Sequence, residues 1–378
     1  MGTSSHLVPA GMPSSGEPCS SSYTQPQIKH IHALKTTFSV TVSVTTKTLQ
    51  SSKILKLLQI FCLHCVTNGI CASNLSPHEV SYINLPNVQN QISPLILSFG
   101  ASDPVAATGI HADLASFAAM GCYGLPVITA ILTGDTSQID DLHPLDGDLV
   151  DEQARTVLED MPVLAFKVGQ TGSVENVTVI AEIVSDYPEL PLVLDPFNAA
   201  LAEQGPEAED LALAIRELLI PQASLLMISA VELSRLAETW KESSDAESES
   251  DAENSAGTGT EAEDLAADTM TLIESGCEYI LVTGTAGETG EVVNTLYNES
   301  GIVRRDIWQR LPGSHAGAGS TLSAAIAALL ANGLEIPEAV LEAQEFTHAA
   351  LSHAQRLGMG RLIPDRYFWA KEAEHTQL

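Results

Sequence analysis

A glycine-rich turn stands immediately before an apolar stretch near the C-terminus. Residues 313–323 read GSHAGAGSTLS and continue into AAIAALLA, a composition typical of a buried helix. Gly317, Ala318, Gly319 and Ser320 form the turn. At such a turn backbone N–H groups converge, and the helix dipole attracts an anion. Close packing between helices selects the same small residues, so the motif by itself leaves both explanations open.

Charged residues follow three apolar runs that resemble buried strands. Asp103 follows LILSFGAS, Lys167 ends VLAFK, and Asp195 follows LVL. Ligands of parallel α/β sheets bind beyond the carboxyl ends of the strands, so these residues define a candidate site. Asp195 suits a network of magnesium and phosphate, whereas Asp103 could equally cap the following helix. Neither GxxxxGK[ST] nor a strand leading into GxGxxG is present, which argues against P-loop and dinucleotide-binding proteins.

The elements that must position these residues alternate along the chain. Helices are predicted at 109–120, 150–160, 174–186, 210–219, 320–332 and 336–357. Strands are predicted at 95–99, 125–132, 163–167, 192–194, 225–228 and 279–283, with an antiparallel ribbon at 295–297 and 302–305. Strand–helix alternation of this kind predicts an α/β fold with a mostly parallel sheet covered on both faces.

Charge divides the chain and limits its partners. The 378 residues carry a net charge of −31, which argues against binding to nucleic acid or to an anionic membrane surface. Residues 1–94 carry a net charge of +3 and residues 95–378 one of −34, so we expect a poorly ordered N-terminal extension at 1–94 and one domain at 95–378. Residues 242–264 hold nine acidic residues and no basic one, which predicts a disordered acidic insert.

Two further features bear on the location of the protein. The six cysteines are scattered, so we expect no disulfide framework and a reducing cytoplasm. The apolar stretch 54–72 is interrupted by polar residues and falls short of the roughly 20 apolar residues that span a bilayer.

The order of motifs over residues 95–367 resembles the ribokinase-like superfamily, and within it the hydroxymethylpyrimidine/phosphomethylpyrimidine kinases of thiamine biosynthesis. GASDPVAATGIHAD is similar to the family's G-x-D-P-S-G-G-A-G-[IL]-Q-A-D, and FKVGQTGS to its K-[IL]-G-M-[LI]-[GA]-S. LVLDPF, LVTGTAGE and LPGSHAGAGSTLSAAIA match V-[VL]-D-P-V, L-[IV]-[TK]-G-G-H and the G-[ST]-G-C-T-L anion-hole motif. The resemblance implies a ribokinase-like fold and ATP-dependent phosphorylation of hydroxymethylpyrimidine, of its monophosphate, or of both, with Mg²⁺.

The resemblance also assigns roles to individual residues. It places Asp103, His111 and Gln170 at the pyrimidine, and Lys167, Thr283 and Gly284 at the nucleotide. It places Asp195 and Glu232 at magnesium, and the turn of Gly317, Ala318, Gly319 and Ser320 at the phosphoryl group being transferred. Because members of the family often dimerise through strands beside the site, it also suggests a homodimer.

Several residues depart from the family pattern within the expected site. Ser320 stands where these kinases have Cys and ribokinases have Asp, and a Ser hydroxyl is a poor base without a His or Lys partner. His315 is near in sequence. Ser229 replaces the Asn of N-x-x-E, and Ala106-Ala107 replaces Gly-Gly. Gln170 stands at the usual Met of the K-x-G-M segment, and His111 stands at the family's Gln, so the substrate pocket also differs. Three functions therefore stay open: a working, slow kinase of this family; a non-catalytic pyrimidine- or nucleotide-binding paralogue; and a kinase for another alcohol, such as a pyridoxal-type substrate.

Overall fold

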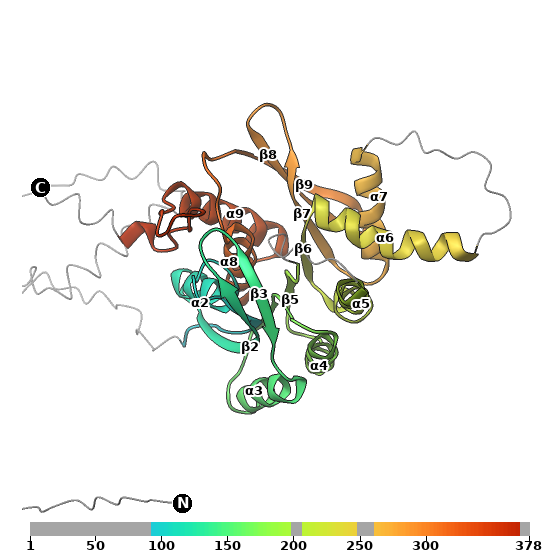
Figure 1. Cartoon of the computed structure of the whole chain (residues 1–378), viewed down its shortest axis with the longest axis horizontal. Coiled ribbons are helices and arrows are strands. Elements are labelled where there is room, and N and C mark those ends of the chain that lie inside the picture. Colours follow the sequence, from blue (N-terminus) through green and yellow to red (C-terminus); the bar gives the residue numbers. More distant parts are fainter. Residues whose placement is uncertain (1–91, 198–205, 248–260, 371–378) are drawn as a thin grey trace, which may run out of the picture. The chain divides into compact units, whose positions relative to one another are not determined.

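Figure 1 shows the computed structural model, which describes residues 92–197, 206–247 and 261–370. The predicted N-terminal extension lies outside these ranges except for residues 92–94. Residues 248–260 of the predicted acidic insert also lie outside them. Helices α6 (Ala230–Glu247) and α7 (Glu261–Glu274) include residues 242–247 and 261–264 of the predicted insert, so the prediction of disorder is wrong for these residues. Glu and Ala are strong helix formers, and an acidic composition alone does not prevent a helix.

The described residues form one nine-stranded sheet in the order β3-β2-β1-β4-β5-β6-β7-β8-β9. Neighbouring strands from β2 to β7 pair in parallel, whereas β3, β8 and β9 pair antiparallel with their neighbours. The prediction of a mostly parallel sheet is thus confirmed. The strands are β1 (Leu95–Ser102), β2 (Tyr123–Gly134), β3 (Ile139–Pro144), β4 (Ala165–Val168), β5 (Leu192–Leu194), β6 (Leu225–Ser229), β7 (Tyr279–Ala286), β8 (Glu291–Asn298) and β9 (Gly301–Gln309).

Helices cover both faces of the sheet because successive strand residues point to opposite sides. Ile96, Ala165 and Leu225 pack in one core with helices α2, α8 and α9. The residues that follow them, Leu97, Phe166 and Leu226, pack in the other core with α3 to α7 (Figure 1). The helices not yet bounded are α2 (Gly109–Ala119), α3 (Gly147–Asp160), α4 (Val174–Ser185), α5 (Pro206–Ala214), α8 (Ala318–Ala331) and α9 (Ile336–Ser352).

Two local features differ from the sequence prediction. Strand β3 was not predicted because it is an edge strand whose sequence, IDDLHP, is mostly polar. The helix predicted at 210–219 begins earlier, as α5, and ends in a π-helical turn at Ile215–Leu219. Among the helices of the described part, none is long and apolar enough to cross a membrane.

Candidate active site

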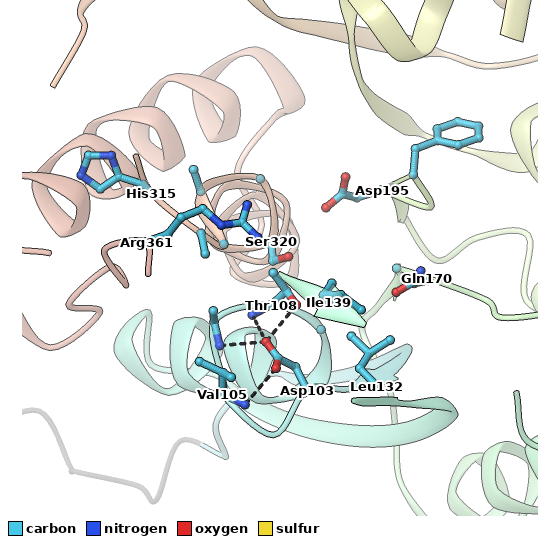
Figure 2. A pocket seen from close by; sticks show the side chains of 18 of the residues that line it. Asp103, Val105, Thr108, Leu132, Ile139, Gln170, Asp195, His315, Ser320 and Arg361 are labelled. Carbon is cyan, nitrogen blue, oxygen red and sulfur yellow. Dashed lines mark hydrogen bonds between the residues drawn. The ribbon is translucent and has the colours of Figure 1, made fainter. Parts of the chain in front are cut away.

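The carboxyl ends of the parallel strands open into a cavity of about 280 Å³. Asp103 follows β1, Gly169 and Gln170 follow β4, and Asp195 follows β5. The first turn of α8 closes one side of the cavity, and the β2–β3 hairpin closes another (Figure 2). Most of the predicted site residues line this cavity: Asp103, Lys167, Gln170, Asp195, Glu232, Thr283, Gly317, Ala318, Gly319 and Ser320.

Helix α8 begins with a backbone that only glycine suits. Gly317 is its N-cap and has a left-handed φ of 80°. A Cβ at Gly317 would overlap the carbonyl oxygen of Ala107, so the close approach of the two segments also requires glycine. The N–H groups of Ala318, Gly319 and Ser320 lie in the first helical turn, where no preceding carbonyl is available. They are therefore the donors that an anion in the cavity would use.

Asp103 organises the loop between β1 and α2. Its Oδ1 accepts a hydrogen bond from the Val105 N–H (2.9 Å). Its Oδ2 accepts from the N–H groups of Ala107 (3.0 Å) and Thr108 (2.9 Å) and from the Thr108 hydroxyl (3.0 Å). Both carboxylate oxygens are thus already hydrogen-bonded within the loop, but the N-cap of α2 is Thr108, so Asp103 does not cap that helix as the sequence had allowed. Asp103 lies at the cavity wall, and its direct effect is on the shape of that wall (Figure 2).

A buried arginine ties this loop to α8. Arg366 donates from Nη2 to the Ala107 carbonyl (2.7 Å), from Nη1 to the Ala106 carbonyl (3.3 Å), and from Nε to the Thr321 hydroxyl (3.0 Å). Burial lowers the pKa of its guanidinium to about 10. Ala106, which replaces a family glycine, has a φ of 57° and so bears a left-handed backbone with a side chain. Sequence reasoning missed Arg366 because it lies in the C-terminal segment, far along the chain from its partners.

Lys167 forms a buried ion pair with Asp113 and is therefore not a free cation. Its ammonium lies 3.0 Å from Asp113 Oδ2, and the two side chains are 1% and 0% exposed. The same oxygen accepts a hydrogen bond from Ser98 (2.8 Å), and Asp113 Oδ1 is buried without a hydrogen-bond partner. Lys167 and Gly284 were both predicted to bind the nucleotide, but they line different cavities. Lys167 lines the 280 Å³ cavity, and Gly284 lines a second, adjoining one. Asp113 is the last residue of the motif GASDPVAATGIHAD, and the sequence analysis did not predict it to be a site residue.

Two further carboxylates, Asp195 after β5 and Glu232 in α6, line the cavity. Burial raises the pKa of Asp195 to about 7, and Lys167 and a hydrogen bond from Ser323 (2.8 Å) oppose that rise. Glu232 accepts a hydrogen bond from the Ser229 N–H (2.8 Å), and the Ser229 hydroxyl accepts one from the Glu232 N–H (3.3 Å). This reciprocal pair is a capping box at the start of α6. Ser229 thus has a structural role at a position where the family has Asn.

Ser320 and His315 both line the cavity, but their side chains do not meet. Figure 2 shows the His315 ring directed away from Ser320. No hydrogen bond joins them among the described residues, and partial burial lowers the pKa of His315. His111 does not line the cavity, contrary to the prediction: it is exposed on α2, and its Nε2 lies 3.2 Å from the Ser102 hydroxyl. Its exposed position on α2 could not be read from the motif, which fixed only its place in the chain.

A second cavity, of about 490 Å³, adjoins the first at the start of α8. Met227, Thr283, His315, Ala318 and Gly319 line both cavities. The second is lined by β7, β8 and α9 and includes the predicted residue Gly284 and the ring of Trp308. Two of its polar atoms, Thr347 Oγ1 and His348 Nε2, are buried without a hydrogen-bond partner.

The two cavities and the donor-rich helix start between them define a phosphotransferase with an α/β sheet. Residues 103–365 match the family model for phosphomethylpyrimidine kinase. The hydroxymethylpyrimidine/phosphomethylpyrimidine kinase of Rhizobium meliloti is 30% identical over 71% of this chain and 95% of the relative. The chain therefore belongs to the phosphomethylpyrimidine kinase family.

Solved structures agree with this assignment of the fold. An ADP complex of Bacillus subtilis pyridoxal kinase is 25% identical, with a TM-score of 0.59, and the match covers 72% of this chain and 97% of that one. The phosphomethylpyrimidine kinase of Clostridium difficile is 25% identical, with a TM-score of 0.54, and covers 68% and 100%. The predicted ribokinase-like fold is confirmed.

Proposed function

We propose that this protein transfers the γ-phosphoryl group of ATP to hydroxymethylpyrimidine, to its monophosphate, or to both. The start of α8 between two adjoining cavities is the observation that carries the proposal. An acceptor in the smaller cavity and a nucleotide in the larger one would both reach the N–H groups of Ala318, Gly319 and Ser320. The name of the Rhizobium relative supports the choice of substrate.

The larger cavity suits an adenine nucleotide. An aromatic ring and apolar side chains provide the flat, apolar surface that a purine needs. The unpartnered Thr347 Oγ1 and His348 Nε2 leave hydrogen-bonding capacity for the polar edge of a base. The ADP bound to the pyridoxal kinase supports this assignment.

Asp195 and Glu232 fit a magnesium site shared with phosphates. Mg²⁺ is usually bound by one or two carboxylates together with phosphate oxygens and water. Each carboxylate has one oxygen that accepts a hydrogen bond, from Ser323 or from the Ser229 N–H, and each has a second oxygen. The buried Asp195 would gain most from a cation, because burial disfavours its charged form. A bound Mg²⁺ would neutralise charge on the transferring phosphate.

The chemistry relies on positioning and on charge stabilisation. The acceptor oxygen is the hydroxyl oxygen of the alcohol or a phosphate oxygen of the monophosphate. It forms a bond to the γ-phosphorus as the bond to ADP breaks, and an alcohol also loses its hydroxyl proton to solvent. The α8 N–H groups stabilise the negative charge on the phosphoryl oxygens. Among the described residues no hydrogen bond joins Ser320 to a base, and loss of a general base costs typically about 10²–10⁴-fold in rate. We therefore expect a slow enzyme rather than an inactive one.

The test is product detection by mass spectrometry with Mg-ATP and each pyrimidine. We expect the mono- or diphosphate to appear above an enzyme-free control. Ser320→Cys should raise the rate at least about tenfold, because a thiol at a helix N-terminus ionises far more readily than an alcohol. Ser320→Ala is the matched control and should not raise it. Absence of product from both the native protein and Ser320→Cys would contradict the proposal and favour the non-catalytic paralogue.

A pyridoxal-type alcohol is the second candidate substrate, because a pyridoxal kinase matches nearly its full length to this chain. Gln170 at the cavity wall is a departure from the pyrimidine kinase pattern that bears on this choice. The ratio of kcat/KM for pyridoxal and hydroxymethylpyrimidine distinguishes the two candidates. A cytoplasmic location and a homodimer stay predictions from the sequence, to be tested by localisation of the tagged full chain and by light scattering.

A further inference from the structure

Arg361 places a positive charge in the wall of the 280 Å³ cavity without a carboxylate partner. Its Nε is buried and has no hydrogen-bond partner. Within the described ranges, no ion pair includes Arg361, whereas Arg155 and Arg304 each pair with aspartate. Arg361 as a whole is half-buried, but a buried guanidinium nitrogen without a partner is costly, so the arrangement favours a ligand that supplies negative charge.

The structure holds Arg361 in place from the backbone. The Arg361 N–H donates to the Thr136 carbonyl (2.8 Å), and the preceding Gly360 N–H donates to the Thr136 hydroxyl (2.9 Å). A Cβ at Gly358 or at Gly360 would collide with Thr136, so both glycines are needed for this contact. The C-terminal segment is therefore fixed to the β2–β3 hairpin, and Arg361 is presented to the cavity from a rigid position.

The other charged side chains that line the cavity are Lys167 and the carboxylates of Asp103, Asp135, Asp195 and Glu232. Lys167 is neutralised by Asp113, and Asp103 is occupied by N–H groups from its own loop. Figure 2 shows the Arg361 guanidinium directed toward Ser320, at the first turn of α8. The guanidinium and the helix N-terminus are thus two independent anion-binding features on the same side of the cavity.

We propose that Arg361 binds a phosphate group of the reactants together with the N–H groups at the start of α8. A guanidinium is always charged, and its planar fork matches two oxygens of a phosphate. The phosphate has two sources: the one that a monophosphorylated acceptor already carries, and the γ-phosphoryl group being transferred. The inference rests on the proposed function for these sources, whereas anion binding itself can be tested without catalysis.

The first experiment measures binding of inorganic pyrophosphate by calorimetry in the full chain. We expect Arg361→Met to weaken binding about 10- to 100-fold, the range for loss of a hydrogen bond to a charged group. Arg361→Lys should lie between, since it keeps the charge and loses the fork. Arg305→Met is the matched control, because Arg305 is an exposed arginine on β9 and lines neither cavity. Equal affinity in Arg361→Met and Arg305→Met, with unchanged circular dichroism, would overturn the proposal.

The second experiment identifies the source of the phosphate from kinetics. If Arg361 binds the phosphate of the acceptor, Arg361→Met raises KM about 10- to 100-fold for the monophosphate alone. If it binds the transferring group, kcat falls by a similar factor for alcohol and monophosphate alike. Unchanged constants for both acceptors count against either role. If the native protein phosphorylates neither acceptor, the proposed function fails while the pyrophosphate measurement still decides the role of Arg361.

Discussion

The most direct test of the helix start is to replace Gly317 by alanine. Two costs follow from its geometry. The left-handed backbone at φ 80° costs a non-glycine residue roughly 1–2 kcal/mol. The new Cβ would also overlap the Ala107 carbonyl, which must then move away from Arg366 Nη2. Loss of a hydrogen bond to a charged group costs about 1.5–3 kcal/mol.

We expect Gly317→Ala to lower the free energy of unfolding by about 2.5–5 kcal/mol in total. For a domain of this size that corresponds to a fall in Tm of roughly 5–20 °C, at roughly 2–4 °C for each kcal/mol. Differential scanning calorimetry measures it. Kinase turnover should fall with it, because the donors of the first turn shift with the displaced loop.

Gly319→Ala is the matched control two residues further on. A Cβ at Gly319 meets the Met227 Cε at 3.6 Å, an ordinary contact, and its φ lies outside the left-handed region. Alanine is favoured over glycine in a helix by about 1 kcal/mol, so the Tm should stay constant or rise by a few degrees. If Gly317→Ala melted within about 2 °C of the native protein, the proposed requirement for a left-handed glycine against Ala107 would be refuted.

Three further perturbations test the charges and the loop around the cavity. Lys167→Met leaves Asp113 buried and unpaired, so the free energy of unfolding measured in urea should fall by about 3–5 kcal/mol. Adding Asp113→Leu should restore part of it. A fall below about 1 kcal/mol would contradict the buried ion pair. The folded-state pKa of Asp195 is raised to about 7, so the native state keeps a proton that the unfolded state loses above about pH 4. The free energy of unfolding without Mg²⁺ should therefore fall as pH rises from about 4 to 7. Asp195→Asn should remove that part of the pH dependence. Ala106→Gly relieves a left-handed backbone worth about 1–2 kcal/mol but adds about 0.4–1 kcal/mol of unfolded-state entropy. The net change in Tm should thus be zero or positive, whereas Ala107→Gly at the buried neighbouring position should lower it.

Sequence patterns predicted the parallel strands and most helices because these depend on local periodicity. Strand β1 lies where a continuous apolar run predicted a buried strand, helix α2 lies where helical spacing predicted it, and the carboxyl ends of the strands meet at one edge. Strand β3 escaped prediction because an exposed edge strand needs no apolar alternation. Helix α7 escaped because its sequence continues the acidic composition of the preceding segment.

The sequence by itself determined the glycine-rich helix start and the acidic residues that follow the strands. Local geometry explains this, because a left-handed turn requires glycine and a strand end positions the next side chain. Only the tertiary structure decided which of those groups stay available. In the folded chain Lys167 pairs with Asp113, Arg361 lines the cavity, and Arg366 joins the β1–α2 loop to α8. These contacts join residues far apart in the chain, so spacing along the sequence could not predict them. The hydrogen bonds of Asp103 to its own loop are local, but they depend on a loop conformation that the sequence pattern did not predict.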